Sequence, residues 1–232
     1  MAILALEQST PAASVVLLRD GVVIAAHDWH EARKRDQNLF AALPRLLATG
    51  GVGIEAIDRI AVGLGPGSFS GVRIAIAAAC ALALPDRRPI AGIGSAAALA
   101  RGTMRETGDS HVAVVGDARR QRLWLAAYRL QPETGTMEPE IPLSLLPSEE
   151  LTQRLPGECH VVTSEWNRLE DQLAPLSDRH WTVIPESRYP TATDVAQLAA
   201  QLSEDELVSP LDPPDPLYLH PAVFVAPRFP TA

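Results

Sequence analysis

The sequence is poor in lysine, cysteine and aromatic residues, and these shortages narrow the classes of protein to which it can belong. Of its 20 basic residues only Lys34 is a lysine, so a mechanism that needs a buried lysine has one candidate, which lies in a charged run. The two cysteines, Cys80 and Cys159, form no CxxC pair and are interpreted as buried, reduced thiols. A net charge of -8 argues against a protein that binds nucleic acid alone, because phosphate contacts need a basic face.

Long apolar runs and a leader segment are also missing. No uninterrupted apolar stretch approaches the roughly 18 residues that a membrane span needs, and the short apolar run at residues 2–6 does not have the form of a signal peptide. Hydrophobic residues make up 47% of the chain, which is enough for a sizeable core. We therefore expect a cytoplasmic protein without membrane contact, built as one large domain or two small ones.

Apolar runs and amphipathic segments follow one another in the same order in both halves of the chain. That order is three strands, then helix, strand, helix, strand and helix. In the first half these elements are predicted over residues 2–6, 14–18, 22–26, 36–48, 59–64, 72–84, 89–93 and 95–100. In the second half they are predicted over residues 111–116, 122–130, 137–146, 149–155, 159–163, 166–173, 181–185 and 193–202. Pro44 lies inside the first predicted helix and is expected to kink it or to delay its start.

The repeated order predicts an α/β fold of two ribonuclease-H-like lobes, each with a mixed five-stranded sheet and helices. Two such lobes form the actin/sugar-kinase architecture; the alternative is an unrelated pair of α/β layers. The predicted lobes are residues 1–102 with 191–208, and residues 103–190. The proline-rich tail 209–232 is expected to lie extended over the surface. Since Glu7 and Asp117 end the first strand of each half, we expect both carboxylates at the mouth of the cleft between the lobes.

The stretch GLGPGSFSGVRIAIAAACALAL, residues 63–84, contains the most distinctive motif of the chain. It lacks the lysine of a phosphate-binding P-loop, and Ser68 stands where a dinucleotide fingerprint needs its third glycine. Phe69 occupies the place of the serine in a nucleophile elbow. Gly65 and Gly67 permit close backbone approach, and Ser68 or Ser70 can cap the helix that follows. An anion site at this helix start and a simple helix cap both stay open.

The helix predicted after this corner is apolar on all sides, apart from one arginine. A helix on the outside of a sheet normally presents a polar face to water. This pattern therefore indicates that the outer side of the helix packs against another helix or another chain. Its small alanine residues would allow a close approach.

Metal-binding and catalytic patterns are weak. None of the six histidines pairs with another at helical i, i+4 spacing, so no metal site is predicted. Glu7 and Asp117 could orient water or Mg²⁺ beside a nucleotide phosphate, but strand-end carboxylates are also common in turns. A small actin-fold kinase or ATPase is therefore one alternative function, and a peptidase that uses Ser68 or Ser70 is another.

Four segments of the sequence resemble the bacterial TsaB family. They are AILALEQSTPAASVVLL, AVGLGPGSFSGVRIAIAAACALAL, GDARRQRLWLAAY and PLYLHPAV, in the family's order from residue 2 to 223. The corresponding family motifs are D-T-S-T at the end of the first strand, G-P-G-S-F-T-G-[LV]-R, D-A-R and P-x-Y-L-R. Glu7-Gln8 replaces Asp-Thr, Ser70 replaces Thr, His220 replaces Arg, and Arg35-Asp36 stands where relatives usually have a histidine.

The resemblance implies an actin-like, non-catalytic paralogue of the transferase TsaD, without that enzyme's metal-binding histidines. Such proteins pair with TsaD and with the ATPase TsaE to make threonylcarbamoyladenosine beside the anticodon of tRNAs that read codons beginning with A. This chain would be the scaffold and activator. It would need no cofactor of its own, since ATP and Mg²⁺ serve the whole complex, and it would meet tRNA only through that complex. A homodimer through the first-lobe helices is also implied.

The resemblance and the apolar helix together predict which residues carry the function. The predicted partner or dimer interface consists of Leu39, Phe40, Leu43, Phe69, Val72, Arg73, Ile76, Ala79 and Cys80. Weaker candidates for contacts to a nucleotide or anion are Glu7, Ser9, Gly65, Gly67, Ser68 and Asp117. No catalytic residue and no metal ligand is predicted.

Overall fold

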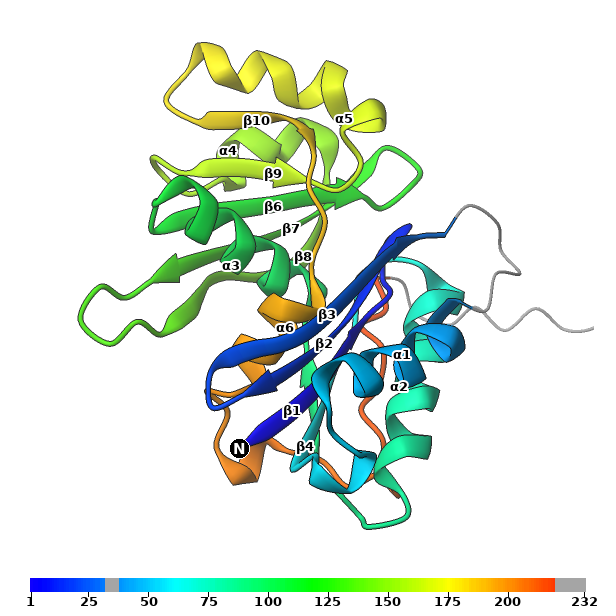
Figure 1. Cartoon of the computed structure of the whole chain (residues 1–232). Helices are drawn as coiled ribbons and strands as arrows, with labels where there is room; N and C mark the ends of the chain where they lie inside the picture. The colour runs from blue at the N-terminus through cyan, green and yellow to red at the C-terminus, as the bar shows by residue number, and fades with distance from the viewer. Residues whose placement is uncertain (32–37, 220–232) are drawn as a thin grey trace, which may run out of the picture.

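The computed structural model describes residues 1–31 and 38–219, and their strands form two separate sheets of five, one in each lobe (Figure 1). The first sheet has the order β3-β2-β1-β4-β5 and the second has the order β10-β9-β6-β7-β8. The first-sheet strands are β1 (Ala2–Glu7), β2 (Ala12–Arg19), β3 (Val22–His30), β4 (Arg59–Gly63) and β5 (Ile90–Ile93). The second-sheet strands are β6 (His111–Asp117), β7 (Arg122–Leu130), β8 (Met137–Pro147), β9 (His160–Thr163) and β10 (Thr182–Ser187).

Both sheets have the same topology. In each, the first three strands pair antiparallel, and the fourth and fifth continue the sheet in parallel with the first. Parallel neighbours need a crossover connection, which a helix supplies on the face of the sheet. This is the ribonuclease-H-like arrangement, present twice, so the predicted actin-like architecture is confirmed and the unrelated pair of α/β layers is excluded.

Helices cover both faces of each sheet (Figure 1). In the first lobe, α1 (Asn38–Gly50) and α2 (Phe69–Ala83) lie on one face and α6 (Ala192–Ala199) on the other. In the second lobe, α3 (Ser95–Thr107) covers one face, while α4 (Leu151–Arg154) and α5 (Trp166–Leu173) cover the other. Short 3₁₀ turns occupy Ile54–Ala56, Ser148–Glu150, Ala174–Asp178 and Glu204–Glu206. Within the two described ranges, no helix is long and apolar enough to cross a membrane.

The central strand β1 is apolar from Ala2 to Leu6 because both of its faces are covered. Leu4 and Leu6 point to the cluster that contains α1 and α2, whereas Ile3 and Ala5 point to the cluster that contains α6. Alternate side chains of a strand face opposite sides of the sheet, and a strand covered on both faces carries a continuous apolar run. The run at residues 2–6 is therefore that of a fully buried strand.

Several element boundaries differ from those predicted. The described part of α1 runs from Asn38 to Gly50, and residues 36 and 37 lie outside the described part of the chain. Pro44 lies inside this helix on its exposed side and supplies no N–H to the helix. The helix predicted at 149–155 is a 3₁₀ turn followed by four helical residues, and α3 is longer than predicted.

The layer between the two sheets consists of α3 and α6, which contact each other. Residue 102, the predicted end of the first lobe, falls inside α3, whose Ala96, Leu99 and Met104 pack on the second sheet. The predicted lobe boundaries themselves stay predictions. Residues 208–219, which we call the C-terminal strap, run beside β5, and Ile90 and Val208 exchange two backbone hydrogen bonds of 2.9 Å.

A buried arginine joins the end of α6 to the start of β4. The side chain of Arg59 is 5% exposed, and its guanidinium donates to the carbonyls of Ala199 (2.5 Å) and Leu202 (3.2 Å). It also donates to the Glu204 carboxylate at 2.9 Å, but the Glu204 side chain is 83% exposed. The two carbonyl contacts therefore contribute more to stability than the ion pair does.

We predict that Arg59→Ala lowers the free energy of unfolding by about 2–3 kcal/mol, because two carbonyls lose their donor. The matched variant Glu204→Ala removes only an exposed partner and should cost less than about 1 kcal/mol. Equilibrium unfolding in urea measures both. Equal losses in the two variants would contradict this account of Arg59.

Candidate functional site

The glycine corner, residues 63–71, packs directly on the turn between β1 and β2. A Cβ atom added to Gly67 would lie 2.1 Å from the Ser9 carbonyl oxygen, and one added to Gly71 would lie 2.1 Å from the Gln8 carbonyl oxygen. The Ser68 N–H donates to the Ser9 carbonyl at 2.6 Å. The glycines at 67 and 71 are thus required by the contact between two backbone segments, a role that needs no phosphate.

The start of α2 is closed by its own cap. Ser68 is the N-cap residue, and its hydroxyl oxygen accepts a hydrogen bond from the Gly71 N–H at 3.2 Å. With the Ser68 N–H bound to Ser9, two backbone donors at this helix start are already in use. Of the two open interpretations, the geometry favours the capped helix over the anion site. A peptidase that uses Ser68 would need a histidine beside it. No histidine is among the described residues that line the cleft between the lobes, next to Ser68.

Glu7 does not lie at the mouth of the cleft, so its expected position was wrong. Its side chain is fully buried beneath the corner, where Oε1 accepts from the Ser9 N–H (2.6 Å) and Oε2 accepts from the Ser95 hydroxyl (2.8 Å). The Ser95 oxygen in turn accepts from the Gly65 N–H at 3.0 Å. The carboxyl therefore anchors the corner, and its burial raises the pKa of Glu7 above the ordinary value.

Asp117 does lie in the cleft between the lobes, a cavity of about 570 Å³ that Ser9, Gly67 and Ser68 line from the other side. Its Oδ1 accepts from the Arg119 N–H at 2.7 Å, and its Oδ2 lies 3.5 Å from the Arg119 guanidinium and 3.4 Å from that of Arg168. Arg168 also lies 3.5 Å from the Glu165 carboxylate, which accepts from the Asp117 N–H at 2.9 Å, so two arginines and two carboxylates are paired in this part of the cleft. Within the described residues, no group of three or more histidine, cysteine, aspartate or glutamate side chains could hold a metal.

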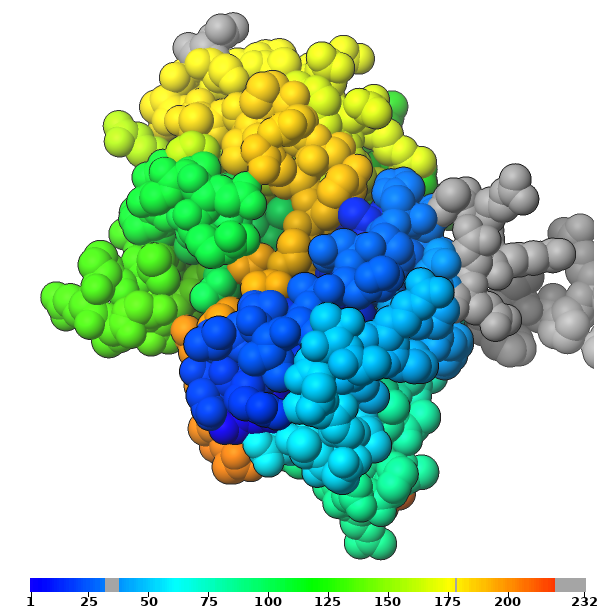
Figure 2. Space-filling view, viewed as in Figure 1, coloured from blue at the N-terminus to red at the C-terminus, as the bar shows by residue number. Residues whose placement is uncertain are grey.

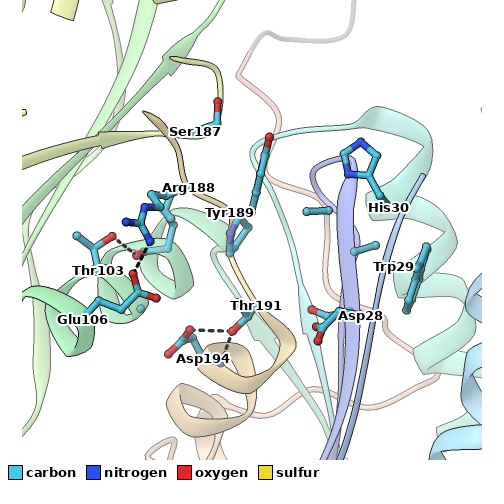
Figure 3. Close-up of a pocket in the computed structure, with 16 residues that line it drawn as sticks. Asp28, Trp29, His30, Thr103, Glu106, Ser187, Arg188, Tyr189, Thr191 and Asp194 are labelled. Atoms are coloured by element: carbon cyan, nitrogen blue, oxygen red, sulfur yellow. Dashed lines mark hydrogen bonds and ion pairs between the residues drawn. The ribbon is translucent and has the colours of Figure 1, made fainter. Parts of the chain in front are cut away.

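A second cavity, of about 450 Å³, lies where α3, β3 and residues 187–191 meet (Figures 2 and 3). Its charged residues are mostly paired with one another or with close neighbours. Arg188 donates to Glu106 at 2.7 Å, and the buried Asp194 accepts from Arg101 at 2.8 Å and from the Thr191 hydroxyl at 2.7 Å. Figure 3 shows the Arg188–Glu106 and Thr191–Asp194 pairs on its left and centre. The paired side chains around this cavity therefore join α3 to residues 188–194.

The helices α1 and α2 begin at the same end of the first sheet, because β3 and β4 both run parallel to β1. Large apolar side chains are exposed on their outer side: Phe40 (58%), Phe69 (60%), Ile74 (42%) and Leu84 (48%). We call these four residues with Arg73 the α1–α2 face. An exposed apolar surface of this kind is typical of a site for another protein.

Only part of the predicted interface lies on this face. Phe40, Phe69 and Arg73 are exposed there, and Cys80 is half-buried. The prediction was wrong for five residues that point into the first-lobe core, namely Leu39, Leu43, Val72, Ile76 and Ala79.

Sequence reasoning missed three residues of the exposed surface. Ile74 and Leu84 lie on the outward side of α2, which an all-apolar helix does not reveal by its pattern. Tyr218, in the C-terminal strap, lies beside Phe69 and Arg73. The motif P-x-Y-L-R was a signal that this tyrosine matters, but its spacing gave no indication of where the residue lies.

The two cysteines are free, as expected, but they differ in burial. Cys159 is buried, and burial raises the pKa of its thiol to about 12. It is therefore an unreactive core residue. Cys80 is half-buried, so its predicted burial is only partial.

The fold and site define an actin-like protein in which the two strand-end carboxylates are apart and the first-lobe helices present an apolar face. Comparisons agree with this description. The family model described as TsaD, tRNA N6-adenosine threonylcarbamoyltransferase, matches residues 30–142. The tRNA threonylcarbamoyladenosine biosynthesis protein TsaB of Escherichia coli K12 is 32% identical over 224 residues, 94% of each chain. The chain belongs to the TsaB family, as its motifs predicted.

Two further relatives are consistent with that membership. TsaB of Bacillus subtilis 168 is 30% identical over 142 residues, which are 61% of this chain and 60% of the relative. The structure of YeaZ from Pseudomonas aeruginosa superposes with a TM-score of 0.80 at 32% identity, covering 94% of this chain and 99% of that one. At this identity and coverage the likeness extends to the whole two-lobed arrangement.

We predict that Glu7→Gln makes the protein less sensitive to rising pH. When pH rises through the ordinary carboxyl pKa, the unfolded chain loses the Glu7 proton before the folded chain does, because burial raises the folded pKa. Wild-type stability at this site is therefore present at low pH and is lost as pH rises. The difference in melting temperature, variant minus wild type, should be more positive at about pH 8 than at about pH 5.

Thermal unfolding followed by circular dichroism at both pH values measures this difference. Glu133→Gln, which neutralises an exposed carboxyl in the turn between β7 and β8, is the matched control and should show no such trend. A melting-temperature difference for Glu7→Gln that is the same at both pH values would contradict the raised pKa.

Proposed function

We propose that this chain is the non-catalytic scaffold and activator subunit of a tRNA threonylcarbamoyltransferase, and that it acts by binding a TsaD-like catalytic subunit. That complex transfers a threonylcarbamoyl group to the adenosine beside the anticodon of tRNAs that read codons beginning with A. The observation that carries the proposal is the α1–α2 face, in a chain of the TsaB family. Its exposed aromatic and aliphatic side chains suit a protein partner.

The similarity to the transferase family suggests how the two subunits meet. The matched residues 30–142 include both α1 and α2, so a TsaD-like subunit has counterparts of these helices. Two related faces of this kind can pack across a pseudo-twofold axis, as identical faces do in a symmetric dimer. The same geometry would allow a homodimer, which would compete with the catalytic subunit for the face.

The charge of the chain bears on its other partners. A net charge of -8 disfavours binding of phosphates by the chain alone, so we propose that this subunit meets tRNA only within the complex. The TsaE-like ATPase is the third member, and the complex as a whole uses ATP and Mg²⁺. This chain requires no cofactor of its own. We propose that the protein acts in the cytoplasm, where bacterial tRNA is modified.

The chemistry of the cleft supports a non-catalytic role. A kinase of this fold would place two carboxylates around ATP and Mg²⁺, but Glu7 is enclosed beneath the glycine corner and Asp117 is paired with Arg119 and Arg168. The cleft of about 570 Å³ is nevertheless large enough for a nucleotide, which keeps the kinase as the alternative.

We expect isothermal titration of the isolated chain with ATP and Mg²⁺ to show no binding up to about millimolar nucleotide. The two carboxylates among the described residues that line the cleft, Asp117 and Glu165, are both paired with arginine. The chain should also show no ATP hydrolysis. Saturable binding together with turnover would replace the scaffold role by that of a kinase or ATPase.

We predict that Ile74→Glu abolishes binding to the TsaD-like subunit of the same organism while the chain stays folded. Ile74 is 42% exposed, so a carboxylate is tolerated in the free protein but must lose its water in an apolar interface. Affinity should fall by at least about 100-fold. Ile76 is unsuitable for this test because its side chain lies in the core.

Calorimetric titration of the two purified subunits measures the affinity, and circular dichroism confirms folding. Val22→Glu is the matched control, since Val22 is 63% exposed at the start of β3, the opposite end of the lobe from the first turns of α1 and α2. In cells depleted of their own TsaB, the wild type and Val22→Glu should restore threonylcarbamoyladenosine, and Ile74→Glu should not. Wild-type affinity in Ile74→Glu would remove this face from the proposal.

A further inference from the structure

The C-terminal strap is held against the glycine corner at one point. The Leu217 N–H donates to the Leu64 carbonyl at 2.9 Å, immediately before Gly65. Between this contact and the pairing at Val208, the strap carries the prolines of the sequence PLDPPDP, which offer no N–H to the edge of β5. The strap thus covers the edge of the sheet at β5. Its next residue, Tyr218, lies at the start of α2.

Tyr218 and Phe69 enclose the guanidinium of Arg73. The Tyr218 hydroxyl oxygen accepts from Arg73 Nε at 2.9 Å and from Nη2 at 2.6 Å. The guanidinium carbon lies 3.6 Å from the centre of the Phe69 ring and 5.4 Å from that of the Tyr218 ring. Tyr218, which is 145 positions from Arg73 in the sequence, and Phe69 therefore hold the arginine side chain between them.

This cluster contributes little to the stability of the free protein. Phe69 is 60% exposed, Tyr218 is 51% exposed and Arg73 is exposed. An exposed cation–π contact is worth only about 0.5–1 kcal/mol. Tyrosine and arginine are, however, the residues in which interface energy concentrates, and a side chain already ordered in the free protein loses less entropy when a partner binds.

The orientation of Arg73 also indicates what it can bind. Nε and one Nη2 donor are taken by Tyr218, and within the described part of the chain the remaining three N–H donors have no hydrogen-bond partner. These donors form the outer end of the guanidinium, the part that binds a carboxylate through two parallel hydrogen bonds. The complementary surface is an apolar helix face that carries one carboxylate.

We propose that Tyr218 is a positioning residue of the α1–α2 face: it holds Arg73 in the orientation that takes a carboxylate of the TsaD-like subunit. This inference rests on the proposed function, since the occupant of the face is the catalytic subunit. It assigns the C-terminal strap to the partner-binding surface. It also joins two separate motifs, GPGSFSGVR, which ends in Arg73, and PLYL, which contains Tyr218, in one contact.

The test is a double-mutant cycle on affinity for the purified TsaD-like subunit. Tyr218→Phe removes the hydroxyl acceptor and keeps the ring, and should weaken binding about five- to tenfold without a change in melting temperature. Arg73→Ala should weaken binding about 30-fold or more. The double variant should bind as Arg73→Ala does, within about twofold, because the hydroxyl acts only through the arginine. Tyr189→Phe, the same change in the interlobe segment, is the matched control and should bind as the wild type does.

The outcomes separate the two proposals. If the wild type does not bind the catalytic subunit, the proposed function fails. If the wild type binds but Tyr218→Phe binds equally well, or if the losses from Tyr218→Phe and Arg73→Ala simply add, the role of Tyr218 is overturned while the proposed function stands. Weakened self-association in analytical ultracentrifugation, with binding to the catalytic subunit unchanged, would overturn the choice of occupant.

Discussion

The carboxyl group of Glu7, enclosed beneath the glycine corner, is the contact on which the arrangement of the first lobe depends. It joins the end of β1 to the following turn through Ser9, and to the corner and the start of α3 through Ser95. The corner can lie so close only because positions 67 and 71 have no side chain. This contact sets the point at which α2 begins and hence which of its side chains face outward.

The same close packing removes the usual chemistry of a two-lobed cleft. A phosphate site at the start of α2 needs free backbone N–H groups and an exposed carboxylate for the metal. Here the N–H of Ser68 is bound to the neighbouring turn, and the carboxyl of Glu7 serves as a structural anchor. Across the cleft, Asp117 is held by Arg119 and Arg168. The carboxylates and the backbone donor that such a site would use are therefore engaged with neighbouring groups of the chain.

The chain exposes apolar surface on the outside of the first lobe. The helix α2 uses one side for the sheet and leaves Phe69, Ile74 and Leu84 in water. Exposure of this surface is unfavourable for the free protein, and burial against a partner relieves it. Leu217 and Tyr218 of the C-terminal strap lie at the same place, so this segment contributes to the surface that the corner begins.

The sequence by itself determined the order of strands and helices, the two-lobed architecture and membership of the TsaB family, because periodicity and short motifs are local properties of the chain. Tertiary structure alone decided which of two equally apolar neighbours, Ile74 or Ile76, faces water, since only packing on β1 and β4 distinguishes the two sides of α2. It also decided that two similar strand-end carboxylates differ: Glu7 is enclosed by α3 and the corner, whereas Asp117 is open to the cleft. The pairing of Arg73 with Tyr218 spans 145 residues, and only the path of the strap along β5 brings the two together.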